Sequence, residues 1–297
     1  MFMIILIVGR YSIRDINQIK LIVDVVLSNQ YDMASKLEYV SASNNGAKHA
    51  YRLRGKVAIV TASTTGIGYE IAKRLAEEGA LVVIGSRRKD NVDAAVKALK
   101  NEGLNVEGVV CHVGNPEHRR NMIDFAVKMY GGIDIFISNA AVNPVVAPAI
   151  ETDEKVWDKL FDINVKCMWL MAKEVIPEMR KRGGGSIVFI SSIGAYTFDF
   201  VLQPLGAYAV TKTALLGLTK CISHETVDYN IRVNCVAPGV ADTKFATTVN
   251  EILATIPMKR WAMPSEMAGA VAYLASDDAS YVTGETISVA GGMHSHL

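Results

Sequence analysis

The stretch KVAIVTASTTGIG, residues 56–68, predicts a buried strand that runs through a short turn into a helix. Its run VAIV is continuously apolar, which is typical of a parallel strand covered on both faces. After the turn, Ile67, Ile71 and Leu75 recur at four-residue intervals, and Gly79 can end the helix that they predict. The stretch therefore predicts a strand–turn–helix unit.

The turn of this unit, residues 61–68, has the composition of a phosphate-binding loop. Backbone N–H groups at a helix N-terminus, together with the positive end of the helix dipole, attract a pyrophosphate. Gly66 and Gly68 would let the ligand and the neighbouring strand approach closely. Two glycines alone also fit an ordinary strand-to-helix turn, and it is the strand–turn–helix context that favours a dinucleotide.

The alternation of apolar runs and helical periodicity continues along the chain. Helical segments are predicted at Val156–Arg182, as one helix or two, and at Ala207–Glu225. Alternating strands and helices indicate an α/β fold, a parallel sheet covered by helices on both sides, in a single domain spanning residues 53–297. The predicted strands are Lys56–Ala62, Leu81–Gly85, Val106–His112, Ile133–Ser138, Ser186–Ser191, Arg232–Val236 and Thr286–Val289.

The composition is that of an ordinary globular protein. Of the 297 residues, 50% are hydrophobic and 21% are charged, which allows a large buried core. A net charge of +1 and a pI of about 7.7 give no sign of a nucleic-acid or acidic-membrane partner. The cysteines lack the spacing of a zinc site, so we expect no metal and interpret them as four buried reduced thiols, typical of a reducing compartment. They are Cys111, Cys167, Cys221 and Cys235.

Residues 1–52 form a predicted N-terminal extension of unknown role. The apolar run Met1–Val8 is too short to cross a bilayer and lacks the basic segment and cleavage site of a signal peptide. Acidic residues in the extension argue against a transit peptide. We expect no membrane span, and both an extension without a targeting role and a translation start at Met33 stay open.

The chain ends in Ser295-His296-Leu297, a variant of the peroxisomal address Ser-Lys-Leu. His296 keeps a residue that can carry positive charge in the middle position. A free end after Gly291-Gly292 would be accessible to a receptor, so we expect binding to the peroxisomal import receptor. A chance match in a cytoplasmic protein is the alternative.

The second predicted strand runs into Gly85-Ser86-Arg87-Arg88-Lys89, where a dinucleotide fold meets the adenosine ribose. An acidic residue there would bind the 2′-hydroxyl of NAD, whereas a basic residue accommodates the 2′-phosphate of NADP. No acid occurs before Asp90, while Arg87 and Arg88 can bind phosphate oxygens. The sequence therefore favours NADP(H), with a solvated basic turn as the alternative.

Tyr208 and Lys212 lie four residues apart on a predicted helix and therefore share a face. A phenol has an ordinary pKa of about 10, and an adjacent ammonium with a cationic nicotinamide would lower it towards neutrality. Tyr208 could then give a proton to a carbonyl oxygen as a hydride reaches the carbon, or accept one in reverse. A Tyr/Lys pair at this spacing also occurs by chance on helix faces.

Two further polar residues could complete such a site. Ser192 follows a predicted strand, and ligands of open α/β sheets bind beyond the carboxyl ends of strands. Its hydroxyl could hold the substrate oxygen beside Tyr208, or it could be a simple turn residue. Asn164 lies within a predicted helix, where it could introduce a kink and hold a water next to Lys212, or be merely exposed.

The chain resembles the short-chain dehydrogenase/reductase superfamily over residues 53–292. The resemblance implies a Rossmann-like doubly wound parallel sheet of about seven strands, an Asn/Ser/Tyr/Lys tetrad and a homotetramer paired partly through the helices that carry Asn164 and Tyr208. The motifs that carry it, in the order of the superfamily, are Thr61–Gly68, Asn139-Ala140-Ala141, Asn164, Ser192, Tyr208–Lys212 and Pro238-Gly239.

The resemblance also implies which residues contact NADP(H). Tyr208 and Lys212 belong to this set as well as to the catalytic one. The others are Ala62, Ser63, Thr64, Gly66, Ile67, Gly68, Ser86, Arg87, Arg88, His112, Val113, Asn139, Ala140, Pro238, Gly239, Val240 and Thr243.

Several details are similar to one peroxisomal, NADP-dependent member of the superfamily in particular. This likeness implies a carbonyl reductase and retinol dehydrogenase that reduces aromatic ketones, α-dicarbonyls or retinal to alcohols, and the reverse. The details are Thr61-Ala62-Ser63-Thr64, Cys111-His112-Val113, Ser138–Pro144, Ser86-Arg87 and the terminal Ser-His-Leu.

Three departures from the superfamily pattern bear on the site. Ala62 replaces a glycine, which suits an extended or right-handed backbone but not a positive φ. His112 replaces an aspartate and would change the contact to the adenine amino group. Ser192 precedes Tyr208 by 16 residues, against about 13 in the family, and the insert Thr197–Leu205 would border the substrate.

The segment Val240–Ala262 would form a lid over the substrate. Its large apolar side chains could line a wall for bulky carbonyls, or a helix pair could pack on the core. They are Phe245, Ile252, Leu253, Ile256 and Trp261. Two other functions stay open: a β-ketoacyl thioester reductase shares the tetrad, and a non-catalytic NADPH-binding scaffold would have no need of both Tyr208 and Lys212.

Overall fold

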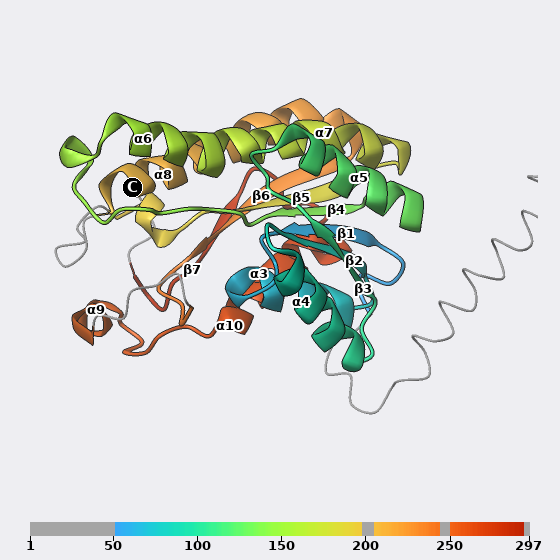
Figure 1. Ribbon diagram of the computed structural model, residues 1–297, viewed down its shortest axis with the longest axis horizontal. Helices are drawn as coiled ribbons and strands as arrows, with labels where there is room; N and C mark the ends of the chain where they lie inside the picture. The colour runs from blue at the N-terminus through green and yellow to red at the C-terminus, as the bar shows by residue number, and fades with distance from the viewer. Residues whose placement is uncertain (1–50, 198–204, 244–249, 294–297) are drawn as a thin grey trace, which may run out of the picture. The chain divides into compact units, whose positions relative to one another are not determined.

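The computed structural model describes residues 51–197, 205–243 and 250–293. Within them a seven-stranded parallel sheet is covered by helices on both faces (Figure 1). Residues 1–50, the terminal Ser295-His296-Leu297 and most of the insert Thr197–Leu205 lie outside the described residues. The role of the extension, the peroxisomal address and the effect of the insert therefore stay predictions.

Strands and helices alternate as the sequence predicts, and each predicted strand is present. The strands are β1 Val57–Thr61, β2 Leu81–Ser86, β3 Val106–Val110, β4 Ile135–Ser138, β5 Gly185–Ile190, β6 Ile231–Pro238 and β7 Thr286–Val289. The helices are α3 Gly66–Glu77, α4 Lys89–Asn101, α5 Pro116–Tyr130, α6 Glu154–Phe161, α7 Cys167–Lys181, α8 Gly206–Thr226, α9 Asn250–Thr255 and α10 Pro264–Ala275. The strand β3 stops short of the predicted His112, whose N–H donates to the His118 ring instead of to a strand.

The strand order β3-β2-β1-β4-β5-β6-β7 confirms the Rossmann-like doubly wound sheet. All neighbouring strands are parallel, with Val57 opposite Leu81 in β2 and Ala58 opposite Ile135 in β4. From β1 the sheet grows through β2 and β3 on one side and from β4 to β7 on the other, so the strand order reverses between β1 and β4. Such a reversal leaves a crevice beyond the carboxyl ends of the two strands, which is where doubly wound folds bind ligands.

The sheet separates two hydrophobic layers (Figure 1). Ala58 and Val60 of β1 belong to the layer formed with α3 and α10, whereas Val57 and Ile59 belong to the layer formed with α5, α7 and α8. Each of these four side chains is 0–1% exposed. Burial on both faces explains the continuous apolar runs, and each larger side chain contributes about 1.5–3 kcal/mol.

The structure decides between one helix and two for the segment after residue 155. The segment Val156–Arg182 contains two α-helices, α6 and α7, joined by a π-helical turn over Asp162–Lys166.

The prediction of four buried thiols is wrong for Cys221, which lies exposed on α8 and donates to Glu225 Oε1 at 3.2 Å. Among the described helices, none has the length and apolarity needed to span a bilayer.

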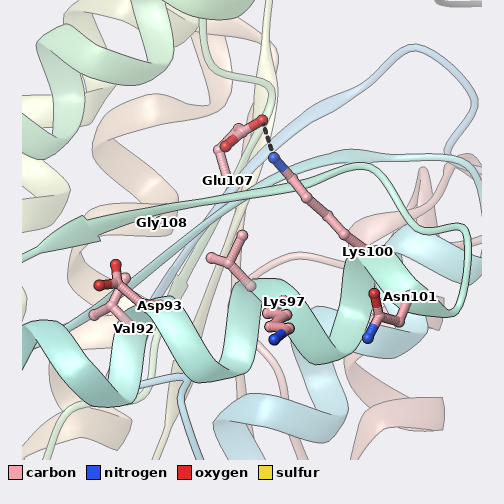
Figure 2. Close-up of a pocket in the computed structure, with 8 residues that line it drawn as sticks. Val92, Asp93, Lys97, Lys100, Asn101, Glu107 and Gly108 are labelled. Atoms are coloured by element: carbon pink, nitrogen blue, oxygen red, sulfur yellow. Dashed lines mark hydrogen bonds and ion pairs between the residues drawn. The ribbon is translucent and has the colours of Figure 1, made fainter.

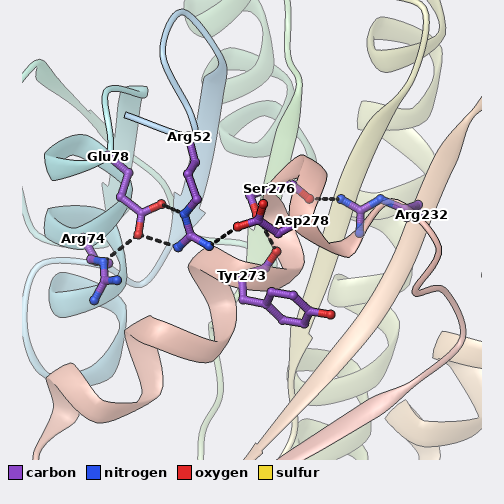
Figure 3. Close-up of polar contacts among 7 residues, drawn as sticks. All are labelled: Arg52, Arg74, Glu78, Arg232, Tyr273, Ser276 and Asp278. Atoms are coloured by element: carbon purple, nitrogen blue, oxygen red, sulfur yellow. Dashed lines mark hydrogen bonds and ion pairs between the residues drawn. The ribbon is translucent and has the colours of Figure 1, made fainter. Parts of the chain in front are cut away.

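An ion-pair network joins the start of the described chain to α3 and to the turn after α10 (Figure 3). The Glu78 side chain, 0% exposed, accepts from Arg52 Nε at 2.9 Å and Nη2 at 2.8 Å, and from Arg74 Nε at 2.7 Å. The remaining Arg52 nitrogen, Nη1, donates to Asp278 at 2.7 Å. A forked guanidinium thus bridges two segments 200 residues apart, the end of α3 and the turn after α10, whose helices pack through apolar side chains.

Candidate active site

The turn between β1 and α3 leaves backbone donors available for an anion. Thr65 is the N-cap of α3 with an extended backbone, and its side chain makes no capping hydrogen bond. The first N–H groups of α3 therefore keep their donor capacity at the positive end of the helix dipole. Gly66 adopts a φ of +61°, which an L side chain rarely takes. These features fit the pyrophosphate of a dinucleotide.

Gly68 is required by the packing of α3 against the end of β1. A Cβ at this position would lie 2.6 Å from the Ala62 carbonyl oxygen and 3.0 Å from Ser63 Cα. The Ser63 hydroxyl donates to Val60 O at 2.6 Å and accepts from Gly85 N at 3.2 Å. Ser63 is fully buried and ties β1 to β2, so its hydroxyl shapes the loop.

The backbone of Ala62 differs from the expectation. Its φ is +50°, in the left-handed region, whereas we expected an alanine there to be harmless in an extended or right-handed conformation. Two hydrogen bonds from the Asn139 side chain explain why the chain tolerates this: Nδ2 donates to Thr61 O at 3.1 Å and to Ala62 O at 3.0 Å. A left-handed non-glycine residue costs about 1–2 kcal/mol, which these bonds offset.

At the point where the strand order reverses, a side chain at the carboxyl end of β1 binds the backbone at the carboxyl end of β4. The Thr61 hydroxyl accepts from Asn139 N at 3.0 Å and from Ala140 N at 3.2 Å. Thr61 was not among the predicted site residues, although its place at the end of the first strand could have indicated it. The predicted residues Asn139 and Ala140 therefore lie at the ligand-binding crevice, beside the phosphate loop.

The ends of β2 and β3 present the groups predicted to bind adenosine. Ser86 ends β2, and Arg87 and Arg88 follow it with exposed side chains. No described residue forms a hydrogen bond or an ion pair with either guanidinium. His112, after β3, accepts from Gly114 N through Nδ1 at 3.0 Å, which leaves Nε2 to carry the proton of a neutral imidazole. The side chain departs from the family's aspartate by offering a donor instead of an acceptor.

Asn164 lies in the π-helical turn between α6 and α7 and is 0% exposed, so the alternative of a merely exposed residue is wrong. A π turn inserts one residue into the helical ladder here, and the predicted kink of the helix axis stays a prediction. Asn164 Oδ1 accepts from Val142 N at 2.8 Å, and Nδ2 donates to Val142 O at 2.9 Å. The amide therefore fixes the loop that follows β4, and the water predicted beside Lys212 stays a prediction.

Tyr208 and Lys212 share a buried face of α8, as predicted. The Lys212 Nζ lies 5.5 Å from the centre of the Tyr208 ring and donates to Ile190 O, at the end of β5, at 2.8 Å. Tyr208 is 8% exposed and Lys212 is 1% exposed. Ser192, two residues after β5, hydrogen-bonds to Tyr208 and accepts from Gly194 N at 3.1 Å. All four predicted catalytic residues thus lie on elements that meet at the carboxyl edge of the sheet.

Burial dominates the ionisation of this pair. Loss of solvent raises the pKa of the Tyr208 phenol above its ordinary value, and the hydrogen bond with Ser192 opposes the rise. The expected lowering of this pKa requires a bound cationic nicotinamide as well as the amine, and it stays a prediction. Burial lowers the pKa of Lys212 to about 8, with a small opposing effect from Cys235. Any lowering of the Tyr208 pKa would need the additional positive charge of a bound nicotinamide.

The remaining predicted contacts follow β6. Pro238 ends this strand, Gly239 donates to Val289 O of β7 at 2.9 Å, and Val240 accepts from Ala262 N at 3.0 Å. Thr243 lies over the phosphate loop, because a Cβ on Gly66 would be 3.4 Å from its Cγ2.

The base of the predicted lid is described in part. A bridge pairs Ala241 with Ala262, and Ile256 is 3% exposed. Residues 244–249 and the side chain of Ile252 lie outside the described residues, so the wall that includes Phe245 stays a prediction.

Comparisons with known proteins agree with this geometry. A family model described as enoyl-(acyl carrier protein) reductase matches residues 61–294. Dehydrogenase/reductase SDR family member 4 of Bos taurus is 54% identical over 252 residues, covering 82% of this chain and 89% of that protein. Tropinone reductase-like 3 of Erythroxylum coca is 52% identical over 256 residues, covering 83% and 96%. A short-chain type dehydrogenase/reductase structure from Mycobacterium marinum has a TM-score of 0.78 at 30% identity, covering 83% and 98%.

The chain belongs to the short-chain dehydrogenase/reductase family. The predicted family and the closer resemblance to its member 4 are both confirmed. Members of this family are oxidoreductases that use a nicotinamide cofactor, which fits the uncapped N-terminus of α3 and the exposed Arg87 and Arg88.

One surface hollow of this dehydrogenase/reductase lies away from the tetrad. A groove of about 490 Å³ runs between α4 and β3 (Figure 2). Its polar lining includes Lys100, which forms an ion pair with Glu107 at 2.6 Å, and Asp93, which pairs with Lys89. No tetrad residue lines it. Since ligands of such sheets bind beyond the carboxyl ends of the strands, this groove is not the active site.

Three hydroxyl groups around Lys212 were not among the predicted site residues. Ser191 donates to Lys212 O at 2.8 Å, Thr211 donates to Tyr208 O at 2.7 Å, and Thr213 donates to Ala195 O at 3.0 Å. The position of two threonines on either side of Lys212 is visible in the sequence. Nothing in their residue type distinguishes them from ordinary helix threonines, so only the contacts reveal their partners.

Replacing Ala62 by glycine should stabilise the protein. Because φ at this position is +50°, the change Ala62→Gly relieves strain and should raise the free energy of unfolding by about 0.5–1 kcal/mol, measured by urea denaturation. The control is Ala58→Gly, at a buried position of β1 without a positive φ, which should lower it. A loss of stability in both variants would show that Ala62 is not strained.

The stability difference between the wild type and Lys212→Met should depend on pH. The pKa of Lys212 is lowered from 10.5 to about 8 in the folded protein, so between these values only the unfolded chain binds the proton. The wild type should therefore gain stability relative to the variant as pH rises through this window, by about 3 kcal/mol in total. Urea denaturation across the window measures it, with Lys97→Met, at an exposed site, as control. Equal trends in both variants would contradict the lowered pKa.

Proposed function

We propose that this family member is an NADP(H)-dependent carbonyl reductase that converts ketones, dicarbonyls or retinal to alcohols, and catalyses the reverse. One observation carries the proposal. A buried tyrosine hydroxyl at the carboxyl edge of the sheet is hydrogen-bonded to Ser192, and the amine of Lys212 lies 5.5 Å from its ring. This arrangement supplies a proton donor, a second hydroxyl for the same substrate oxygen, and a nearby positive charge.

The residues of the chain would act on the substrate oxygen. Bound NADPH would supply the hydride that reaches the carbonyl carbon. Ser192 would donate a hydrogen bond to the carbonyl oxygen, and Tyr208 would transfer its phenolic proton to that oxygen as the carbon–oxygen double bond becomes single. The phenolate that is left would be stabilised by the ammonium of Lys212, held in place by Ile190 O. Low exposure of both side chains strengthens their electrostatic interaction.

The preference for NADP over NAD rests on the end of β2. Arg87 and Arg88 are exposed, and no described residue pairs with them, so both can bind a 2′-phosphate. The nearest acid, Asp90, lies in the first turn of α4, where its charge is favourable to the helix dipole. Both features support a cofactor with an additional phosphate.

The substrate class rests on the relatives and on the lid. Two relatives are named as a dehydrogenase/reductase and a tropinone reductase-like protein. Ile256 is buried and lines a hollow together with Gly239 and Val240, and Leu253 and Trp261 on the same segment are partly buried. An apolar wall of this kind supports bulky aromatic or isoprenoid carbonyls as substrates.

Assembly and location complete the proposal. Trp169 on α7 is 42% exposed and Val210 on α8 is 36% exposed, which supports a homotetramer that pairs partly through these helices. The terminal Ser295-His296-Leu297 supports import into the peroxisome, and a cytoplasmic protein is the alternative.

A β-ketoacyl thioester reductase is the second candidate. The matching family model is described as an acyl-carrier-protein enzyme, and the same tetrad could reduce a thioester-linked ketone. A scaffold that binds NADPH without turnover is less well supported, because binding alone does not need a buried Tyr208 beside a buried Lys212.

The change Tyr208→Phe should abolish most of the turnover and leave NADPH binding intact. The variant loses the proton donor but keeps the ring and its packing, so kcat should fall by about 10²–10⁴-fold. Initial rates of NADPH oxidation with the best carbonyl substrate measure this, and fluorescence titration measures NADPH binding. The control Tyr273→Phe, on α10, should keep the wild-type rate. A Tyr208→Phe rate within a few-fold of wild type would refute the proton-donor role.

The double change Arg87→Ala with Arg88→Ala should reverse the cofactor preference. Loss of two phosphate ligands should raise the KM for NADPH by about tenfold or more and leave the KM for NADH nearly unchanged. Steady-state kinetics with both cofactors give the ratio, and Arg120→Ala on the exposed surface of α5 is the control. An unchanged NADPH/NADH ratio would contradict the role of these arginines.

A further inference from the structure

Thr211 connects two members of the tetrad through one hydroxyl group. It directly precedes Lys212 on α8 and is 0% exposed. Its hydroxyl donates to the backbone oxygen of Tyr208 at 2.7 Å and accepts from Asn164 Nδ2 at 3.2 Å. A helix threonine ordinarily returns its hydroxyl to its own helix and nothing more. Here the second partner lies on the π-helical turn, so the hydroxyl bridges α8 and the segment that carries Asn164.

The bridge continues beyond Asn164 to the loop after β4. The Asn164 amide pairs with both backbone groups of Val142, at 2.8 Å and 2.9 Å. Val142 in turn packs against the buried cluster of Leu160, Ala207 and Tyr208. Val142, Asn164, Thr211 and Tyr208 therefore form a closed set of contacts around the tyrosine, in which every polar partner is satisfied.

Thr213 makes the corresponding connection on the other side of Lys212. Its hydroxyl donates to Ala209 O of its own helix and to Ala195 O, each at 3.0 Å. Ala195 ends the short 3₁₀ turn that begins after Ser192, and its N–H donates to Ser192 O at 2.9 Å. The two threonines thus attach the helix of Tyr208 and Lys212 to the segments that carry Asn164 and Ser192.

We propose that Thr211 and Thr213 are positioning residues that hold the Tyr208 hydroxyl in a fixed position relative to Ser192 and Asn164. The proposal rests on the proposed function, since it concerns the geometry of that reaction. Threonine suits the task because its branched Cβ restricts χ1, which fixes the direction of the hydroxyl. Small displacements matter at such a site, since a shift of about 1 Å can reduce turnover by about a hundredfold.

A threonine at the far end of α8 provides a matched control. Thr226 is 3% exposed and, like Thr213, donates to a carbonyl of its own helix and to one outside it: Ile222 O at 2.8 Å and Ile231 O at 3.1 Å. It lies 13 residues beyond Thr213, about 20 Å along the helix axis. If Thr211→Val and Thr213→Val reduced kcat only by destabilising α8, Thr226→Val should reduce kcat by the same factor.

The experiment compares Thr211→Val, Thr213→Val and Thr226→Val in the full chain. Each change keeps the shape and removes the hydroxyl. We expect kcat to fall by about tenfold or more in the first two variants and to stay within twofold of wild type in the control, with the dissociation constant for NADPH unchanged in all three. The conservative changes Thr211→Ser and Thr213→Ser should restore most of kcat.

A double variant provides a second test, which does not require the variants to be equally stable. If Thr211 acts through Asn164, the variant Asn164→Ala with Thr211→Val should lose no more kcat than Asn164→Ala alone. Fully additive losses, equal losses in Thr211→Val and Thr226→Val, or failure of both serine variants to restore kcat would overturn the positioning role. A wild type that turns over no carbonyl would instead refute the proposed function, and this inference with it.

Discussion

The burial of one amine is the constraint on which this site depends. Lys212 is 1% exposed, and the carbonyl of Ile190 at the end of β5 accepts a hydrogen bond from it. Removing an ammonium from water is unfavourable unless partners are provided, and this accounts for its lowered pKa of about 8. The amine is therefore close to its ionisation midpoint at neutral to mildly basic pH. Such a group can respond to charge that develops on the neighbouring phenol.

The doubly wound sheet explains how distant residues reach this amine. The carboxyl ends of parallel strands meet at one edge, so the residues after β1, β2, β4, β5 and β6 become neighbours. The Thr61 hydroxyl binds the loop after β4, Asn164 holds the same loop one step further on, and Ser192 follows β5. Strand ends thus place Thr61 and Ser192, and α8 places Tyr208 and Lys212. Hydrogen bonds from Thr61 and Asn164 hold the loop after β4 against them.

Much of the fold and the tetrad could be predicted from the sequence, because both leave local patterns. Continuous apolar runs such as that of β1 follow from burial on both faces, and Tyr208 and Lys212 share a face by helical spacing alone. The positive φ of Ala62 could not be predicted, because it depends on two hydrogen bonds from Asn139, 77 residues away. The raised pKa of Tyr208 also escaped prediction, since it depends on how deeply the packed helix buries the phenol.

The reaction proposed for the buried tetrad is the reduction of a carbonyl with NADPH. Its most direct test is the initial rate of NADPH and NADH oxidation by the purified protein with benzil, isatin, retinal, an aromatic ketone and acetoacetyl-CoA. We expect fast turnover of a dicarbonyl, an aromatic ketone or retinal, with NADPH preferred over NADH. Turnover of acetoacetyl-CoA alone would identify a thioester reductase instead. Binding of NADPH with no turnover of any of these substrates would show that the tetrad does not reduce these carbonyls.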